Sequence, residues 1–546
     1  MRAPSVVAAM LAVGILATAC GGSAPASGTG TGTATAAPAA TTPTAAGSQV
    51  LRIAFQYEPV TMDPAAAQTV EEYQLLALTH NALFTYDNSM TIEDALAASY
   101  AWSADGKTLD VKLKPNTHFS NGDPVTAQDV AFSIQRNLDP AVKSVYAASY
   151  FGLVGAQAYF KGSATTVPGI QVVSPTEIKF QITDVEPYFL NVLALMNSMI
   201  LDHNLSGDTS KVSEAQVGTG PYTLKNWTHN ESMEFVINPK YDLGAAASIP
   251  DVHIQFGLTP DLQVLQFQKG QLDIVYDIPS TNYLQIQNDA KLKADYVKTP
   301  LPSIYYLHVN PKLVPAFNKL QVRQALNYAI DKAKIVAEVT NGRGSIANGP
   351  LPPGIPGYDA SLQPYPYDPA KAKQLLADAG YPNGFSMELD IVPTPDVTKL
   401  AQAVQSMLGQ VGVTVTIKNF TSAVYHQMYL DHKIPFARGD WLLDYPDAQD
   451  FLYLLLDGSS PLNRFQYDNP AFDKIVEHAD SITDQAQRVA LYKQADDMAH
   501  NDAPWIFLYT GIYDGLFQQW VQPRDVNTLL NPILYTQWAQ IHLSAH

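Results

Sequence analysis

The chain has 546 residues, of which 33 are Lys or Arg and 51 are Asp or Glu, so its formal net charge is −18. At about 100–200 residues per domain this length predicts two to four folding units, and the acidic balance excludes tracking of a phosphate backbone and disfavours direct adsorption to anionic lipid. Only 15% of the residues are charged and 29 are Tyr, which suits a cleft that binds a polar organic ligand, although most of these Tyr are expected in the core.

The N-terminal end has the pattern of an exported, lipid-modified protein. Arg2 precedes the apolar run 6–16, which is too short to cross a bilayer. Small residues at 17–19 precede Cys20, the single Cys of the chain. A lone Cys in this setting resembles the lipobox of bacterial lipoproteins, in which the Cys is acylated, although Leu16 is one place further away than usual. We expect a signal peptide over 1–19 and a lipid on Cys20; a plain secretory leader is the alternative.

A tether follows the lipidated Cys. Residues 21–48 are rich in Gly, Ser, Ala, Pro and Thr and carry no charge. Such a composition cannot bury a core, and a segment of this length reaches roughly 30 Å on average. We therefore predict a flexible linker over 20–48 that holds a globular part away from a membrane surface.

The first half of the globular part reads mainly as strands. Thr126 is the expected N-cap of a helix, with Asp129 three places on. Alternating polarity predicts strands over 51–55, 109–113, 177–182, 234–237 and 253–256.

The second half is richer in helices. Asn318 is expected to cap a helix whose apolar residues recur at three and four places, and Asp368-Pro369 begins another helix that ends at Gly380. Further helices are expected over 396–410 and 469–499, the latter broken near Thr483, with a strand over 413–417. Mixed strands and helices predict an α/β chain of two or three lobes.

The order of short motifs resembles family 5 of the bacterial extracellular solute-binding proteins, the oligopeptide- and dipeptide-binding receptors of ABC importers. Each motif alone is weak, but together they run nearly end to end. They are EPVTMDP at 58–64, WSADGKT at 102–108, FSNGDPVTAQDV at 119–130, GTGPY at 218–222, NPKY at 238–241, VRQALNYAID at 322–331, DPAKA at 368–372 and WLLDYPD at 441–447.

The resemblance implies an α/β fold, a two-lobed clamp of the periplasmic-binding-protein type with an inserted subdomain, a discontinuous first lobe and a two-segment hinge. We place the hinge crossings near 304–305 and 508–509, in apolar strand-like runs. Closure of such a clamp on a ligand is a hinge motion. The expected boundaries are lobe I over 49–70, 205–304 and 509–546, the inserted subdomain over 71–204, and lobe II over 305–508.

The resemblance also implies a ligand site in the segment 438–447. In peptide-binding members the acid at the place of Asp444 pairs with the ligand's α-ammonium, and some carry an arginine at the place of Arg438 that meets the ligand's carboxylate. The backbone from Gly439 to Leu443 is expected to pair with an extended peptide as an added strand. Trp441 and Tyr445 are expected to supply walls.

Structural roles compete with these assignments. Asp444 is also typical of a turn, and Arg438 of a surface or interlobe ion pair. Glu58 aligns with a residue near the ligand in peptide-binding members, but also suits an ordinary loop acid. Asp447 is expected to act as a helix cap rather than a ligand contact.

Other site types have weaker support. The run 218–222 lacks the spacing of a phosphate-binding loop, so a structural turn is favoured. His426 and His432 are six places apart, which does not put both on one helix face, so no metal site is expected. We find neither a serine-hydrolase elbow nor a zinc-protease motif, and a glycosidase is disfavoured by the resemblance to binding proteins.

The predicted function is therefore capture of short peptides and their delivery to ABC permease subunits with a cytoplasmic ATPase. No enzymatic activity and no cofactor are expected, and a monomer anchored through Cys20 to the outer face of the bacterial cell membrane is predicted. The alternatives are another ligand, namely an oligosaccharide, a nickel chelate, haem or an opine, a receptor that signals or scavenges without an importer, or a secreted hydrolase.

Overall fold

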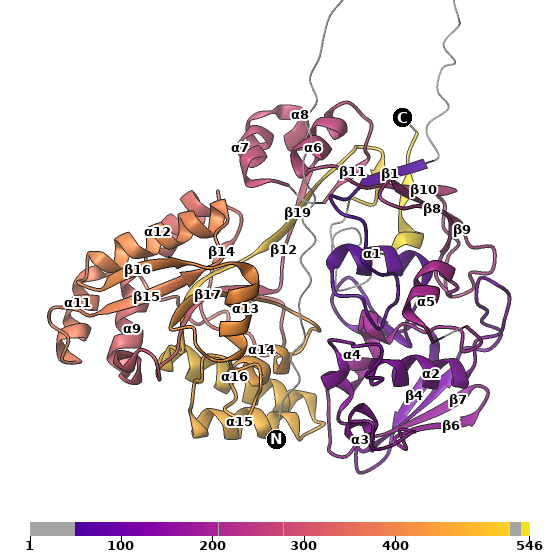
Figure 1. Ribbon diagram of the computed structural model, residues 1–546, viewed down its shortest axis with the longest axis horizontal. Coiled ribbons are helices and arrows are strands. Elements are labelled where there is room, and N and C mark those ends of the chain that lie inside the picture. The colour runs from indigo at the N-terminus through magenta and orange to yellow at the C-terminus, as the bar shows by residue number, and fades with distance from the viewer. Residues whose placement is uncertain (1–49, 206, 277, 525–536, 546) are drawn as a thin grey trace, which may run out of the picture. The chain divides into compact units, whose positions relative to one another are not determined.

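A seven-stranded mixed sheet forms the centre of the first lobe (Figure 1). The computed structural model describes residues 50–205, 207–276, 278–524 and 537–545, so the predicted leader, Cys20 and the linker lie outside the described residues. In spatial order the strands are β12 (Tyr296–Pro300), β19 (Ile512–Phe517), β11 (Ile274–Val275), β1 (Val50–Ala54), β10 (Asp251–Gln255), β9 (Ser232–Ile237) and β8 (Tyr222–Thr228). Strands from both ends of the chain meet in this sheet, which makes the first lobe discontinuous.

Helices and short pairings complete the first lobe. Apolar residues of β1, such as Leu51 and Ile53, are fully buried beneath them. The elements are α1 (Val70–Thr79), α5 (Thr209–Ala215), α6 (Pro260–Gln268), α7 (Ser280–Asn288), α8 (Ala290–Asp295), β20 (Val521–Gln522), β21 (His542–Leu543) and η5 (Trp538–Gln540). Helix α1 lies almost wholly in the range 71–204 expected for the inserted subdomain, but its apolar residues share one buried cluster with those of β1.

A second sheet lies in the inserted segment, in the order β4-β5-β7-β6. The predicted cap of α2 is confirmed, because Thr126 and Asp129 form a reciprocal capping box. The elements are β2 (Phe84–Tyr86), β3 (Ile92–Asp94), β4 (Ala97–Trp102), β5 (Thr108–Leu113), α2 (Ala127–Asn137), η1 (Ala147–Tyr150), α3 (Ala156–Phe160), β6 (Ile170–Ser174), β7 (Glu177–Gln181), α4 (Phe189–Ala194) and η2 (Met196–Ser198).

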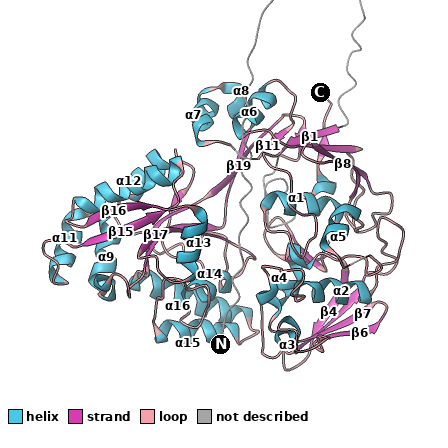
Figure 2. Ribbon diagram, viewed as in Figure 1, coloured by secondary structure: helices cyan, strands magenta, loops and turns pink. Residues whose placement is uncertain are grey.

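The second lobe is built on the sheet β14-β18-β13-β17 and the parallel pair β15-β16, beside which α11 and α12 lie (Figure 2). The strands are β13 (Ser303–Val309), β14 (Ser345–Ile346), β15 (Ser386–Ile391), β16 (Thr414–Asn419), β17 (Phe436–Leu442) and β18 (Trp505–Thr510). The helices are η3 (Pro315–Asn318), α9 (Leu320–Ala329), α10 (Lys332–Lys334), η4 (Ile335–Val339), α11 (Pro369–Asp378), α12 (Pro395–Gly409), α13 (Ser422–Leu430), α14 (Gln449–Leu456), α15 (Pro470–Asp480) and α16 (Gln485–Asp502).

One expected helix cap is wrong. Lys319, not Asn318, precedes α9. Asn318 instead ends the short helix η3, and its side-chain amide donates to the carbonyls of Pro311 and Pro315. The break predicted near Thr483 is correct, since α15 and α16 are separate helices.

Two chain segments connect the lobes side by side. Strand β12 continues into β13, and β18 continues into β19. The changes of sheet fall at Leu301-Pro302 and at Gly511, a few residues from the expected crossings. The amide of Leu301 donates to the carbonyl of Gly511 at 3.1 Å, and the amide of Gly511 donates to the Ser303 hydroxyl at 3.1 Å. The two-segment hinge is thus hydrogen-bonded across its own strands.

Within the described ranges, every helix is too short or too polar to cross a bilayer.

Candidate ligand-binding site

Strand β17 carries much of the predicted site and forms an edge of the second-lobe sheet. The amide of Leu443, just after the strand, donates to the carbonyl of Pro302 at 3.2 Å. In an antiparallel pair every second residue bonds to the neighbouring strand. The backbone groups of Arg438, Asp440 and Leu442 therefore face away from β13, toward the outer edge of the sheet.

Gly439 allows an aromatic ring to lie directly on this strand. A Cβ atom at Gly439 would be 2.5 Å from a ring carbon of Tyr306. The ring of Tyr306 is in turn stacked on Trp505, with centroids 3.8 Å apart. A side chain at position 439 would therefore push this stack out of place.

We expect Gly439→Ala to destabilise the protein by about 1–3 kcal/mol, because the added methyl group overpacks the Tyr306 ring. Urea denaturation followed by tryptophan fluorescence measures the change. Gly409→Ala at the end of α12 is the matched control, since no atom lies within 4 Å of its added Cβ. Equal midpoints for the two variants would contradict the overpacking.

Arg438 lies on the same strand with its charge already paired. Its guanidinium is 3.2 Å from the Asp440 carboxylate, and the two side chains are 29% and 50% exposed. It also lies over the ring of Tyr305, 5.2 Å from the centroid. Arg438 borders two cavities, of about 290 and 400 Å³. Its predicted role as a carboxylate ligand stays a prediction, in competition with the Asp440 pair.

Asp444 borders a cavity of about 150 Å³ that also includes residues of the first lobe. The hydroxyl of Tyr146 donates to its carboxylate at 3.4 Å, and Tyr73 lines the same cavity. Burial raises the pKa of Asp444 to about 6, against the Tyr146 hydrogen bond, which lowers it. The partner supplied by Tyr146 is a hydroxyl rather than a cation, so the ionised carboxylate is poorly stabilised until a positive group binds.

A second acid, Asp450, fixes the segment around Asp444. Its carboxylate accepts the Asp444 amide at 2.9 Å and the Trp441 indole N–H at 3.2 Å. Burial, together with the charge of Asp444, raises the pKa of Asp450 well above its ordinary value, which favours the neutral acid. Asp450 therefore orients the Trp441 ring and the backbone of Asp444. Leu443 is buried and lines the Asp444 cavity.

The end of the segment is held by packing and by a buried ion pair. Tyr445 is stacked on Tyr188 with centroids 6.2 Å apart, and its hydroxyl donates to Gln449 at 2.5 Å. The expectation that Asp447 caps a helix is wrong in its position, because Ala448 is the N-cap of α14. Asp447, one residue earlier, accepts the Gln449 amide and pairs with Arg488. The ligand-wall role of Tyr445 stays a prediction beside this packing role.

Glu58 is engaged with the β8–β9 hairpin. Its carboxylate accepts the Trp227 indole N–H at 2.6 Å, the Asn230 amide at 3.0 Å and a bond with His229 at 2.8 Å. These bonds match the loop-acid alternative, and the ligand role of Glu58 stays a prediction.

One group of acidic and histidine side chains is close enough together to hold a metal ion, but its central carboxylate caps the start of α2. Among the described residues, Asp129, Asp202 and His203 have ligand atoms within 4.8 Å of one another. The Asp129 carboxylate, however, accepts the amide and hydroxyl of Thr126 and bonds to His203. His426 is on α13, and His432 follows that helix and bonds to the Arg464 carbonyl.

Three site residues were missed by the sequence analysis. Tyr73 and Tyr146 precede Asp444 by several hundred residues, 298 in the case of Tyr146. Arg464 lines the cavity of about 290 Å³ that Arg438 also borders. No local spacing links any of them to the segment 438–447, so only the fold brings them together.

Comparison with known proteins places the chain among solute receptors. The sequence model of the bacterial extracellular solute-binding proteins, family 5 (middle region), matches residues 91–462. The chain is 29% identical over 452 residues to heme-binding protein A of Haemophilus influenzae, covering 78% of this chain and 80% of that protein. It is 26% identical over 508 residues to the oligopeptide-binding protein OppA of Bacillus subtilis, covering 89% and 91%.

A solved structure has the same fold. The unliganded open form of MppA, a periplasmic murein tripeptide-binding protein, superimposes with a TM-score of 0.80 at 25% identity. The match covers 92% of this chain and 99% of MppA. The two-lobed α/β architecture is therefore shared over almost the whole of both chains.

Proposed function

The chain belongs to family 5 of the bacterial extracellular solute-binding proteins, and we propose that within this family it captures short peptides and delivers them to the permease of an ABC importer. Members of this family are binding proteins of transporters rather than enzymes. The receptor itself does no chemistry in this proposal, and the partner ATPase supplies the energy.

The observation that carries the peptide assignment is the outer edge of β17 next to Asp444. The outward backbone groups of Arg438, Asp440 and Leu442 offer hydrogen bonds to an extended chain by strand addition. The Asp444 carboxylate at the end of this edge accepts a hydrogen bond from the Tyr146 hydroxyl, and a cationic group of the ligand would balance its charge. A peptide supplies both a backbone and an α-ammonium, so one ligand satisfies the two features.

The names of similar proteins support the same class of ligand. An oligopeptide-binding protein and a murein tripeptide-binding protein are both similar to this chain over about nine tenths of its length. Backbone-dominated recognition implies little preference for particular side chains along the edge.

We further propose that the receptor works outside the cytoplasm as a monomer tethered through a lipid on Cys20. The pattern of residues 1–20 and the uncharged run that follows support this arrangement. Mass spectrometry of the membrane-extracted protein tests it: a diacylated Cys at the mature N-terminus supports the anchor, and an unmodified N-terminus contradicts it.

Native mass spectrometry of the protein from Ser48 onward, followed by denaturing release, tests the ligand class. We expect a heterogeneous set of short peptides, because backbone recognition tolerates many side chains. A single sugar, nickel chelate or opine would keep the family and contradict the peptide assignment. A haem absorption band in the purified protein would do the same and would agree instead with the name of the Haemophilus relative.

A further inference from the structure

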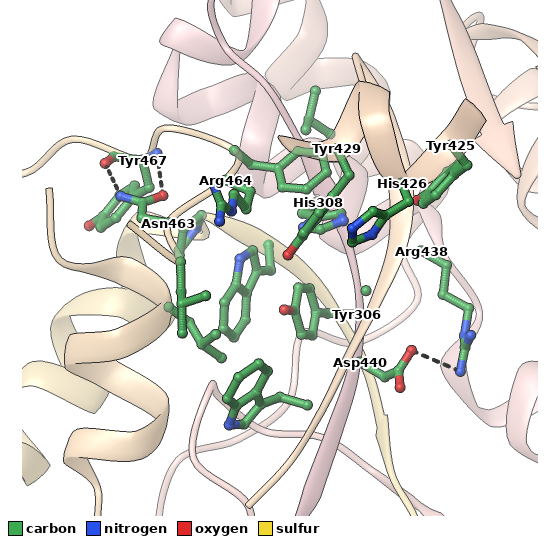
Figure 3. A pocket seen from close by; sticks show the side chains of 18 of the residues that line it. Tyr306, His308, Tyr425, His426, Tyr429, Arg438, Asp440, Asn463, Arg464 and Tyr467 are labelled. Carbon is green, nitrogen blue, oxygen red and sulfur yellow. Dashed lines mark hydrogen bonds and ion pairs between the residues drawn. The ribbon is translucent and has the colours of Figure 1, made fainter. Parts of the chain in front are cut away.

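An aromatic cavity of about 290 Å³ lies beside β17, within the second lobe (Figure 3). Its walls come from β13, α13, β17, the segment 462–467 and β18. The rings of Phe, Tyr and Trp that line it are those of Tyr306, Tyr425, Tyr429, Trp441, Phe465, Tyr467 and Trp505. Such walls favour a flat or apolar body through packing and stacking.

One lining residue, Arg464, is a cation for which the described part of the chain supplies no counter-ion. Its side chain is half-buried, and its Nε atom is buried with no hydrogen-bond partner among the described residues. Its guanidinium lies 5.9 Å from the centre of the Tyr429 ring. Figure 3 shows the contrast with Arg438, whose guanidinium is joined to Asp440, the carboxylate of this cavity.

A partly desolvated guanidinium without an acceptor is costly, and an arriving anion removes that cost. The other lining groups that could carry a charge near neutral pH are His308, His426, Arg438 and Asp440. His308 stays neutral because burial lowers its pKa well below the ordinary value, while His426 is exposed on α13. Asp440 is already engaged with Arg438. The local charge left for a ligand is therefore that of Arg464.

We propose that this cavity is a subsite for a carboxylate-bearing group of the ligand, with Arg464 as the residue that meets the carboxylate. The proposal rests on the proposed peptide function and assigns the anion contact to Arg464 rather than to Arg438. The planar guanidinium suits a carboxylate because it donates two parallel hydrogen bonds, and the rings around it pack the apolar part of the same group.

The position of the cavity sets which part of a peptide reaches it. Trp441 lines the cavity and precedes Asp444 by three residues. An extended chain advances about 3.3 Å per residue, so this separation is about 10 Å. A peptide whose ammonium lies at Asp444 therefore presents its third residue, or the end of a tripeptide, to the cavity.

Helix α13 lets the cavity accept groups of different size. It supplies Ser422, Tyr425, His426 and Tyr429 to the wall, yet none of its own residues is fully buried. A helix with so little buried surface shifts at low cost. The subsite is therefore expected to select ligand groups by their negative charge more strictly than by their shape.

The test compares carboxylate with carboxamide forms of the same tripeptides by titration calorimetry. One arm changes the C-terminal carboxylate to an amide, and the other changes Glu to Gln at the third residue, which separates the two sources of the carboxylate. The protein is expected to prefer the carboxylate form by about 10–100-fold in one arm, as befits a charged hydrogen bond. In Arg464→Met the preference falls to near unity, while the carboxamide peptide binds as before.

Two further variants sharpen the result. Arg464→Lys is expected to keep part of the preference, and Arg438→Met, the matched control, is expected to keep all of it. A preference that survives Arg464→Met, or that disappears in Arg438→Met, overturns the proposal. Unchanged affinity for the carboxamide peptide shows that the variant is folded.

Failure of the peptide function has a different signature. If no short peptide of about two to five residues binds in either form, the proposed function is wrong, and the cavity is tested alone with phenylacetate against phenylacetamide. Trp441 and Trp505 line the cavity and report binding through their fluorescence. A response to phenylacetate that requires Arg464 supports the anion subsite; equal responses, or none, overturn it.

Discussion

Arg488→Met is expected to lower the free energy of unfolding by about 3–5 kcal/mol, the usual cost of breaking a buried ion pair from one side. The Arg488 side chain is 2% exposed and donates to both oxygens of Asp447, with the Nη2–Oδ1 distance at 2.8 Å. It also donates to the Ala479 carbonyl at 3.1 Å and to the Tyr492 hydroxyl at 2.8 Å. Methionine fills much of the volume but leaves Asp447 buried without its cation.

Urea denaturation followed by tryptophan fluorescence measures this loss. The matched control is Lys225→Met, which removes an exposed pair with Glu234 at 3.5 Å and is expected to change stability by less than about 1 kcal/mol. Adding Asp447→Asn to Arg488→Met is expected to recover part of the loss, because the unpaired charge is then gone. Equal effects of the Arg488 and Lys225 variants would contradict a stabilising role for the buried pair.

The consequence extends to the ligand site. Asp447 lies three residues after Asp444, and Arg488 holds it from α16. The Arg488→Met variant is therefore expected to bind ligand more weakly even where it remains folded.

Helix starts and strands of this protein can be predicted from the sequence because they depend on residues only a few places apart. A side chain that bonds to the backbone three residues on can be recognised in the sequence, as Thr126 with Asp129 and Asp368 before Pro369 illustrate. The strand over 413–417 follows in the same way from alternating polarity.

Partners that are far apart in the chain were not predictable in this way. Glu58 fits a ligand acid and a loop acid equally well in the sequence, and only the β8–β9 hairpin brings Trp227 and Asn230 to its carboxylate. Asn318 has the residue type of a helix cap, but its amide donates to the carbonyl of Pro315 instead. In both cases tertiary structure decides which partner the side chain finds.

The two arginines of the site show the same limit more sharply. Arg438 was singled out because it belongs to a recognisable motif, yet its charge is shared with Asp440 on the same strand. Arg464 belongs to no motif, and its lack of a partner among the described residues becomes visible only when the walls of the cavity are assembled. The absence of a counter-ion is a property of packing, and a linear sequence does not record it.

Asp444→Asn is expected to weaken binding of an amine-bearing ligand by about 30-fold or more, since removing one partner of a buried charge pair costs about 2–5 kcal/mol. The amide keeps the size of the side chain but cannot balance an ammonium. Titration calorimetry with a peptide that was released from the purified protein measures the loss of affinity. Asp440→Asn is the control, because Asp440 is 50% exposed and already pairs with Arg438, so a small change is expected there.

The same substitution is expected to stabilise the ligand-free protein. The pKa of Asp444 is raised from 3.8 to about 6 in the folded chain, so the folded state holds the proton more tightly than the unfolded state does. Above a pH of about 6 the ionised carboxylate therefore lowers the free energy of unfolding by about 1–3 kcal/mol. This loss disappears as the pH falls toward the pKa that Asp444 has in the unfolded chain. Denaturation at pH 8 should favour the Asp444→Asn variant, and at pH 4 the difference should shrink.

These opposite signs distinguish a ligand-binding acid from a structural one. A turn or cap acid stabilises the free protein, so its removal lowers stability and leaves ligand affinity largely unchanged. A buried acid whose cation is supplied by the ligand destabilises the ligand-free protein. Its removal therefore stabilises the ligand-free protein and abolishes binding. Affinity for an amine ligand should accordingly fall by up to about tenfold per pH unit below 6, where Asp444 takes up a proton, and this slope should be absent in Asp444→Asn. If the variant loses stability and keeps its affinity at every pH, Asp444 belongs to the scaffold, and the α-ammonium must be recognised elsewhere.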